Sequence, residues 1–373
     1  MIKSRHPLDL FLGMDYKLLG LEHVRLSIPS PRSRNFIVVE HIKRAEGKKK
    51  YTLCVLIKRG VDTFTAIRIL SRELGINARD IGFAGLKDAN ATTLQYVTLP
   101  IVQKKHLVIR LANEKIIVLN CQETVSFRLK RGYIHYNEFI VRAMVREEDE
   151  ILKLHGRPII VPNYYGYQRF GTRRPNTHIL GYFLAKHDLG NILAELLDSP
   201  YPDESPANIV NRLNYKPTWG YERQIHQCIS KGLIRSCLTK APLNIMLEAL
   251  QAYMFNKYLS IRLEEYGVDR ITIPIRGERI IDGYPHAPLI GAKVKLKGDV
   301  RRIYEYIAEE INIRLDDVMR SLKGAYRPIL IRTELKIHKV DQGLLLLKFK
   351  LPPASYATTV LREFTENPYT ISY

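Results

Sequence analysis

The sequence predicts an α+β fold in which a helix-rich segment interrupts a mixed or antiparallel sheet. Short apolar runs typical of strands dominate the first 175 or so residues, and such runs return after about residue 320. Between them, apolar residues recur at helical spacing. The C-terminal strands are therefore expected to rejoin the sheet that the N-terminal strands form.

The composition is that of a folded globular protein with an anionic partner. The 373 residues include 58 Lys or Arg and 38 Asp or Glu, a formal net charge of +20. Residues 1–60 alone carry 13 basic and 5 acidic residues, a net of +8. Nucleic acid is the partner that such a charge favours.

Several classes of protein are disfavoured by what the sequence lacks. It has no apolar run of about 18 residues, and its N-terminus does not resemble a secretory signal, so we expect a cytoplasmic protein without a membrane segment. Cysteines at 54, 121, 228 and 237 form no C-x-x-C pair, which predicts reduced thiols. The scattered histidines predict no metal site. The glycine motifs of ATPases, dehydrogenases, Rossmann methyltransferases and α/β-hydrolases are missing.

The strand prediction begins with apolar runs at 36–39 and 51–57. Gly47 and the lysines at 48–50 lie between them and predict a loop or a hairpin tip, either solvated or contacting phosphate. The remaining predicted strands are 81–84, 94–99, 116–120, 125–129, 139–144, 329–337 and 344–351.

The first predicted helix begins at a Thr63 cap and ends at Gly75. The acidic residues 147–150 fit the N-terminus of another helix better than an active site. Later predicted helices are 176–186 with an Asn176 cap, 189–198, a long helix with Pro242 in its first turn, 301–312 and 315–322.

One segment, residues 82–100 (GFAGLKDANATTLQYVTLP), combines a short strand, glycines and a Lys87-Asp88 pair. A carboxylate beside a cation stays ionised and can act as a nucleophile or a base. An aspartate that opens an Asx-turn after a strand is also common, so the residues alone leave both interpretations open.

This segment resembles the A-G-x-K-D-x-x-A-x-T-x-Q signature of the TruD family of tRNA pseudouridine synthases. Other stretches resemble the family's motifs in the same order. They are NFIVVE at Asn35–Glu40, NYYGYQRFG at Asn163–Gly171, LEALQAYMFN at Leu247–Asn256, GAYRP at Gly324–Pro328 and LPPASYATTVLRE at Leu351–Glu363. The resemblance covers nearly the whole chain.

The resemblance implies isomerisation of uridine to pseudouridine in tRNA, at uridine 13 or at position 35 of a tyrosine tRNA. It implies no cofactor, no metal, no membrane and no required protein partner. Asp88 matches the family's nucleophile, which attacks either C6 of the uracil or C1′ of the ribose. The alternatives are a non-catalytic RNA-binding protein that keeps the fold and an unrelated methyltransferase.

Further site residues carry over from the family's motifs. Asn137 and Phe139 match a G-N-x-F stretch, although Tyr136 stands where the family has Gly. In the family the aromatic ring packs on the target base and the Asn orients the carboxylate. Tyr356 matches a pocket aromatic.

Polar and cationic candidates complete the expected site. Gln168 and Arg169 are expected near the cleft, with Arg169 either contacting RNA or pairing within the protein. Val39 occupies a position where some members have Lys, so the cation beside Asp88 is either Lys87 or Lys43. The resemblance also predicts a discontinuous synthase domain, 1–175 with 321–373, around an inserted TRUD domain, 176–320.

Overall fold

The computed structural model describes residues 1–43, 50–100, 106–130, 132–171, 174–197 and 243–372. The chain forms two compact units, each assembled from segments distant in sequence. The sheet unit comprises Leu19–Val161 and Ile331–Ile371, and the helical unit comprises Met1–Leu18 and Pro162–Leu330 with Ser372. The division into a synthase domain (1–175 with 321–373) and an inserted domain (176–320), which the family resemblance implies, stays a prediction.

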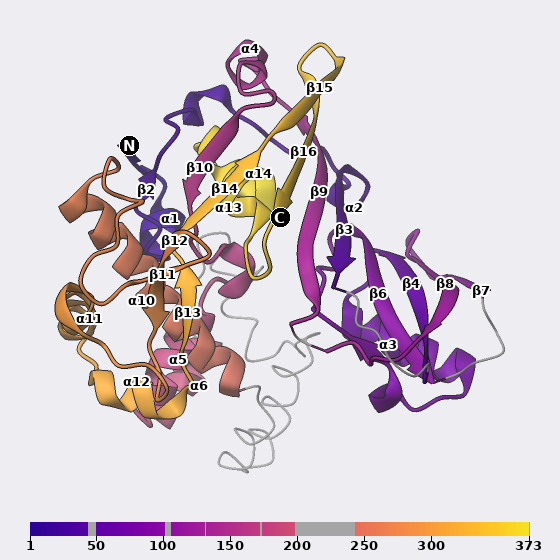
Figure 1. Ribbon diagram of the computed structural model, residues 1–373, viewed down its shortest axis with the longest axis horizontal. Helices are drawn as coiled ribbons and strands as arrows, with labels where there is room; N and C mark the ends of the chain where they lie inside the picture. Colours follow the sequence, from indigo (N-terminus) through magenta and orange to yellow (C-terminus); the bar gives the residue numbers. More distant parts are fainter. Residues whose placement is uncertain (44–49, 101–105, 131, 172–173, 198–242, 373) are drawn as a thin grey trace. The chain divides into compact units, whose positions relative to one another are not determined.

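A nine-stranded sheet forms the sheet unit (Figure 1). Its order is β15-β16-β9-β3-β6-β4-β8-β7, with β5 beside β6. The strands are β3 (Phe36–Ile42), β4 (Tyr51–Arg59), β5 (Gly82–Phe83), β6 (Thr92–Pro100), β7 (His106–Arg110), β8 (Ile116–Val125), β9 (Ile134–Met144), β15 (Lys336–Asp341) and β16 (Leu344–Leu351).

Strands β3 and β6 are parallel and the other neighbours are antiparallel. Strand β16 pairs with β9, so the C-terminal strands do rejoin the sheet of the N-terminal ones. The predicted α+β class with a mixed sheet is confirmed.

Helix α3 (Thr63–Leu74) packs on one face of this sheet. Its buried Ala66, Ile67 and Leu70 belong to the same apolar cluster as Leu56 and Leu119 on the strands. The helix ends at Gly75, which has φ +65° and so suits a residue without a side chain. Its N-cap is Asp62, whose carboxylate accepts from the Thr65 N–H at 2.9 Å, so the expected Thr63 cap is wrong by one residue.

Four strand predictions need correction. The run predicted as a single strand over 329–337 is two strands, β14 (Leu330–Glu334) and β15, which belong to different sheets. Strands β3 and β4 are not a hairpin, because β6 lies between them; residues 44–49 lie outside the described part of the chain. Strand β8 continues to Val125, and no separate strand follows over 126–129. Strand β7 was not predicted. Its apolar run, 107–109, is short and follows basic residues, so the sequence gives only a weak strand pattern there.

Shorter elements complete the sheet unit, and β10 and β14 form a separate pair. They are η1 (Glu22–Val24), α2 (Arg32–Asn35), η2 (Ala78–Asp80), α4 (Glu148–Leu152), β10 (Pro158–Pro162), β14 (Leu330–Glu334), α13 (Ala357–Leu361), η4 (Arg362–Phe364) and α14 (Tyr369–Ser372). Helix α4 has three acidic residues in its first turn, as the sequence indicated.

The helical unit is built around a long helix, α10 (Leu243–Tyr266). The other elements are β1 (Ile2–Lys3), α1 (Pro7–Phe11), β2 (Tyr16–Lys17), η3 (Tyr167–Arg169), α5 (Thr177–Ala185), α6 (Leu189–Leu197), β11 (Arg279–Ile281), β12 (Tyr284–Leu289), α11 (Gly298–Glu310), α12 (Leu315–Ser321) and β13 (Ala325–Pro328). The five predicted helices of this region are present. Within the described residues, no helix is both long and apolar enough to cross a membrane.

Close packing of α5 on α10 requires a glycine. A Cβ added at Gly181 would lie 2.1 Å from the Met246 carbonyl oxygen, so a larger residue would push the helices apart. Asn176 precedes α5, but its amide donates to Glu195 at 2.9 Å instead of capping the helix. Pro242 lies outside the described residues.

The expectation of reduced thiols is wrong for two of the four cysteines. Cys54 on β4 and Cys121 on β8 form a disulfide. The two residues are 67 positions apart in sequence, and the register of β4 against β8 places them opposite each other. Spacing along the chain therefore gave no sign of the pair. Cys228 and Cys237 lie outside the described residues.

Candidate active site

Asp88 lies in the loop between β5 and β6. Its Oδ1 accepts from the Asn90 N–H at 3.1 Å, the Asx-turn that the sequence left open as an alternative. The side chain is nevertheless 32% exposed, and its Oδ2 takes no part in this turn. Asp88 is therefore a carboxylate held by its own backbone turn and still open to a ligand.

Arg32 is the cation beside Asp88. Its Nη1 lies 3.7 Å from Asp88 Oδ2, and its side chain is only 6% exposed. The guanidinium also donates to the carbonyls of Asn90 at 2.8 Å and Ile371 at 3.3 Å, and it lies 4.0 Å from the centre of the Phe36 ring. Burial lowers the pKa of Arg32, and the charge of Asp88 opposes this change.

Neither lysine considered for this cation occupies the position of Arg32. The Lys87 ammonium lies 2.6 Å from Glu40 Oε2 and donates to Asn137 Oδ1 at 2.9 Å. Glu40 is buried, and its Oε1 accepts from the Tyr96 N–H at 3.1 Å. Lys87 and Asp88 thus point to different partners, as expected for neighbouring residues, and Lys87 holds Asn137 in place.

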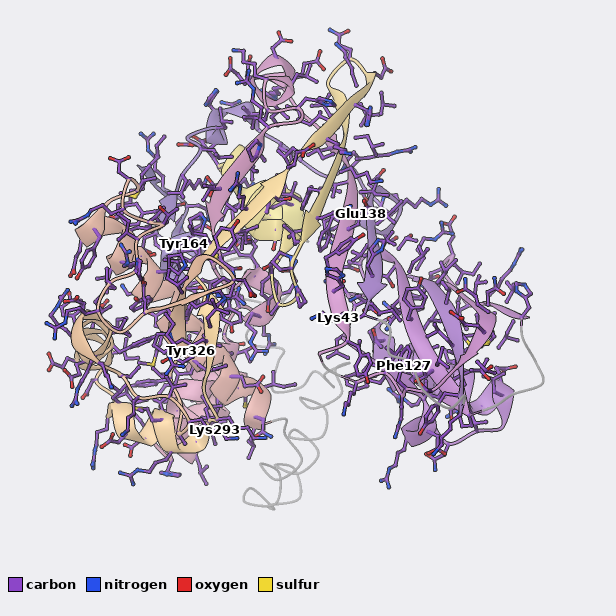
Figure 2. The ribbon with its side chains drawn as sticks, viewed as in Figure 1. Lys43, Phe127, Glu138, Tyr164, Lys293 and Tyr326 are labelled. Carbon is purple, nitrogen blue, oxygen red and sulfur yellow. A yellow bond between two sulfur atoms is a disulfide. The ribbon has the colours of Figure 1, made fainter. Side chains whose placement is uncertain are left out.

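Lys43 directly follows β3 (Figure 2). Its backbone N–H donates to the Tyr133 carbonyl at 2.7 Å. The structure assigns the ion pair with Asp88 to Arg32, which is not among the residues that the sequence indicated. A substrate contact by Lys43 stays a prediction.

An aromatic cluster lies on the same strand as Asn137 and on the strands beside it. Phe139 stacks on Phe349 of β16 at a ring-centre distance of 5.5 Å. Its edge contacts Phe36 at 6.0 Å, and Phe36 in turn carries the Arg32 guanidinium. The ion pair is therefore linked to an apolar wall by direct contacts. Phe36, Phe139 and Phe349 are all buried, at 5%, 7% and 2% exposure, so only a small part of this cluster is open to a planar base.

Tyr356 lies in the sheet unit as the residue before α13. Its carbonyl accepts from the Thr359 hydroxyl at 2.7 Å, which fixes the start of this short helix. Its proposed role as a pocket aromatic stays a prediction.

Gln168 and Arg169 belong to the helical unit, in η3. The Arg169 guanidinium donates to Glu248 of α10 at 2.7 Å, so pairing within the protein, one of its two expected roles, is present. The expected residues therefore divide: Asp88, Lys87, Asn137, Phe139, Tyr356 and Lys43 lie in the sheet unit, and these two residues lie in the other.

Three of the remaining motifs meet inside the helical unit. Arg327 of the GAYRP stretch stacks over the Tyr165 ring at 3.9 Å and donates to Asn163 Oδ1 at 2.9 Å. Asn256 of α10 accepts from the Tyr165 N–H at 2.7 Å. These motif residues therefore build the interior of that unit.

Two buried polar residues of the site region were missed, although their strands gave a signal. Glu40 lies two positions after Val38 and Lys58 two positions after Leu56, so each charged residue shares the interior face of its strand with an apolar residue. A charged residue at such a position is costly unless it has partners. Arg32 had no comparable signal, because it precedes the first strand of the large sheet in a stretch without periodicity.

In chemical terms, the site offers an accessible carboxylate beside a fixed cation, next to a largely buried cluster of aromatic rings. A model of the family described as tRNA pseudouridine synthase D (TruD) matches residues 13–283 and 279–364. The chain therefore belongs to this family of tRNA pseudouridine synthases, which are isomerases that act on tRNA.

Individual relatives agree with this assignment. The chain is 31% identical to a protein of Methanopyrus kandleri over 85% of its own length and 86% of that protein's. It is 30% identical to one of Thermococcus onnurineus, over 89% and 93%. Both carry the name probable tRNA pseudouridine synthase D. The crystal structure of the putative TruD protein of Methanosarcina mazei is similar, with a TM-score of 0.66, 25% identity and 97% and 98% of the two chains covered.

Proposed function

We propose that this protein converts uridine to pseudouridine in tRNA with Asp88 as the nucleophile. The observation that carries the proposal is the pairing of the accessible Asp88 carboxylate with the buried Arg32 guanidinium. The carboxylate is the nucleophilic form of an aspartate, and the fixed cation beside it helps to hold it in place. The carboxylate is also a good leaving group, so one covalent bond can form and break within each cycle.

The target uridine must first leave the base stack. We propose that Phe139, with Phe349 behind it, is the wall against which the base packs, while Asn137 orients the reacting groups. The Asn137 amide oxygen is already bound to the Lys87 ammonium at 2.9 Å, which limits its rotation.

The reaction exchanges one glycosidic bond for another. The bond between C1′ and N1 breaks, the uracil turns, and a bond between C1′ and C5 forms. A proton leaves C5 and a proton is gained at N1, so the atoms balance without a redox step. Asp88 attacks either C6 of the uracil or C1′ of the ribose and is released at the end by either route.

The family resemblance suggests uridine 13 as the target, with position 35 of a tyrosine tRNA as the second candidate. We propose that the protein acts in the cytoplasm without a protein partner, and that 176–320 is an inserted domain. Tyr356, Gln168, Arg169 and Lys43 are proposed to contact the tRNA. The net charge of +20 is consistent with a folded RNA as the ligand.

The test is incubation with unmodified tRNA transcripts, followed by carbodiimide mapping of pseudouridine at each position. A new pseudouridine at position 13, or at 35 in tyrosine tRNA, is the expected result. Binding of every transcript without any pseudouridine would contradict the proposal and favour the alternative, a non-catalytic RNA-binding protein.

A further inference from the structure

Lys58 is a completely buried lysine next to the loop that carries Asp88. It lies on β4, and its relative exposure is 0%. The Nζ donates to three backbone carbonyls: Val61 at 2.7 Å, Asp88 at 3.0 Å and Lys87 at 3.1 Å. An ammonium has three N–H donors, so these three bonds saturate it.

A buried ammonium that bonds to neutral carbonyls is costly to place in a protein. Removal of the charge from water is unfavourable, and three carbonyl bonds offset this only in part. Burial correspondingly lowers the pKa of Lys58 to about 8. An apolar residue at this inward position would avoid the cost, which suggests that the ammonium serves something other than stability.

Two of the three acceptors are the carbonyls of Lys87 and Asp88 themselves. The other side of the same backbone is also held, because the Lys87 N–H donates to the Thr63 hydroxyl at 2.9 Å. The Thr63 hydroxyl in turn donates to Gln95 at 3.1 Å. The backbone of the loop at Lys87 and Asp88 is therefore hydrogen-bonded from strand β4 and from the start of α3. Strand β6 supports these contacts through Gln95.

We propose that Lys58 is a positioning residue for the reaction, whose ammonium fixes the direction in which the Asp88 carboxylate points. This inference rests on the proposed role of Asp88 as nucleophile. Lys58 does not touch the substrate. It acts on Asp88 through the backbone of the loop, whereas Arg32 acts directly on the carboxylate.

The inference predicts an alkaline limit to activity. The charged groups that act on the ammonium are Asp88 and Asp62, which raise its pKa, and Lys87, which lowers it. Above pH 8 the ammonium becomes an amine with two N–H donors and a lone pair. One of the three carbonyls then loses its donor and faces that lone pair, so the loop loses its fixed position.

Stability responds to the same titration with the opposite sign. The pKa of Lys58 is about 8 in the folded protein, whereas an unperturbed lysine has a pKa of 10.5, so between these values the unfolded chain binds more protons. The Lys58 contribution to the free energy of unfolding therefore rises with pH across this window. Activity falls there while this contribution to stability grows, which separates positioning from a merely structural role.

The experiment compares Lys58→Met with the exposed control Lys115→Met. We expect Lys58→Met to bind tRNA like the wild type, with a single-turnover rate about 100-fold lower, as expected for a misplaced catalytic group. Its alkaline fall in rate near pH 8 should be absent, whereas Lys115→Met should match the wild type. A Lys58→Met rate equal to that of the wild type would overturn the inference.

If Lys58→Met does not fold, the wild-type pH profile decides. A rate that falls with an apparent pKa near 8, while the melting temperature does not fall, supports the inference; a rate that is flat from about pH 7 to 9.5 overturns it. Asp88→Asn separates the two proposals. An active Asp88→Asn would refute the proposed nucleophile, whereas an inactive Asp88→Asn together with a fully active Lys58→Met would refute the positioning role alone.

Discussion

The guanidinium of Arg32 lies 3.7 Å from the carboxylate of Asp88, one buried and the other about one third exposed. Arg32 is also held by the Asn90 and Ile371 carbonyls and by the face of Phe36. The cation is therefore fixed before any substrate arrives, and the carboxylate keeps a face open to ligand. Preorganised charge of this kind is what electrostatic catalysis requires.

Replacement of Arg32 should affect the reaction more than tRNA binding. We expect Arg32→Met to lower the single-turnover rate of pseudouridine formation by about 100-fold, because a preorganised charge is lost. Arg34→Met is the matched control: Arg34 lies on the same short helix but is half exposed and pairs with Glu114. Equal rates for Arg32→Met and the wild type would refute the role of the ion pair.

Phe139 can be tested against a phenylalanine of equal burial. Phe139 and Phe127 are both 7% exposed, and Phe127 stacks on Tyr133 at 5.3 Å in a separate apolar cluster. Both Leu variants should lose about 1–2 kcal/mol of unfolding free energy. Only Phe139→Leu should lose about 10-fold or more in rate, as expected for a base-stacking ring. Equal losses of activity in the two variants would make Phe139 a merely structural residue.

Because His178 is buried, we expect the free energy of unfolding to fall as the pH is lowered. It is buried among Tyr253, Phe11 and Phe170, and burial lowers its pKa to about 3. The unfolded chain therefore binds more protons between about pH 3 and 6.5, and the free energy of unfolding falls as the pH falls, by about 1.4 kcal/mol per unit. The aromatic surroundings can accept a phenylalanine.

Urea unfolding of His178→Phe at several pH values between about 4 and 7.5 checks this account. The variant should lose most of the slope that the wild type shows below about pH 6.5, whereas His286→Phe, at a partly exposed histidine of the same unit, should keep it. The same slope in His178→Phe and the wild type would show that His178 is not the group responsible.

The alternation of residues along strands could have predicted part of the site. Lys58, Thr93, Val38, Phe139 and Phe349 are register partners in one row across five strands, on one face of the sheet. The alternation of buried and exposed residues along each strand predicts that these residues face the interior. That they lie side by side in one row depends on the order of the strands. The sequence did not predict this order, because β6 lies between β3 and β4.

Other features of the site depend on tertiary contacts alone. Arg32 reaches Asp88 because α2 packs beside the loop, and no local pattern indicates this. The Cys54–Cys121 pair likewise depends on the register of β4 against β8. Asp88, Asn137 and Phe139 were predicted through the family's motifs, and the structure places all three in the sheet unit.

The central claim, that Asp88 is the nucleophile, is tested most directly by tritium release from tRNA labelled at C5 of uridine, since the reaction must expel the C5 hydrogen. Asp88→Asn is the sharpest variant, because its amide oxygen can still accept from the Asn90 N–H and so keep the turn. Asp80→Asn, at an exposed aspartate of the same unit, is the control. The account predicts that Asp88→Asn binds tRNA but releases no tritium above background, while Asp80→Asn matches the wild type. Tritium release by Asp88→Asn at the wild-type rate would contradict it.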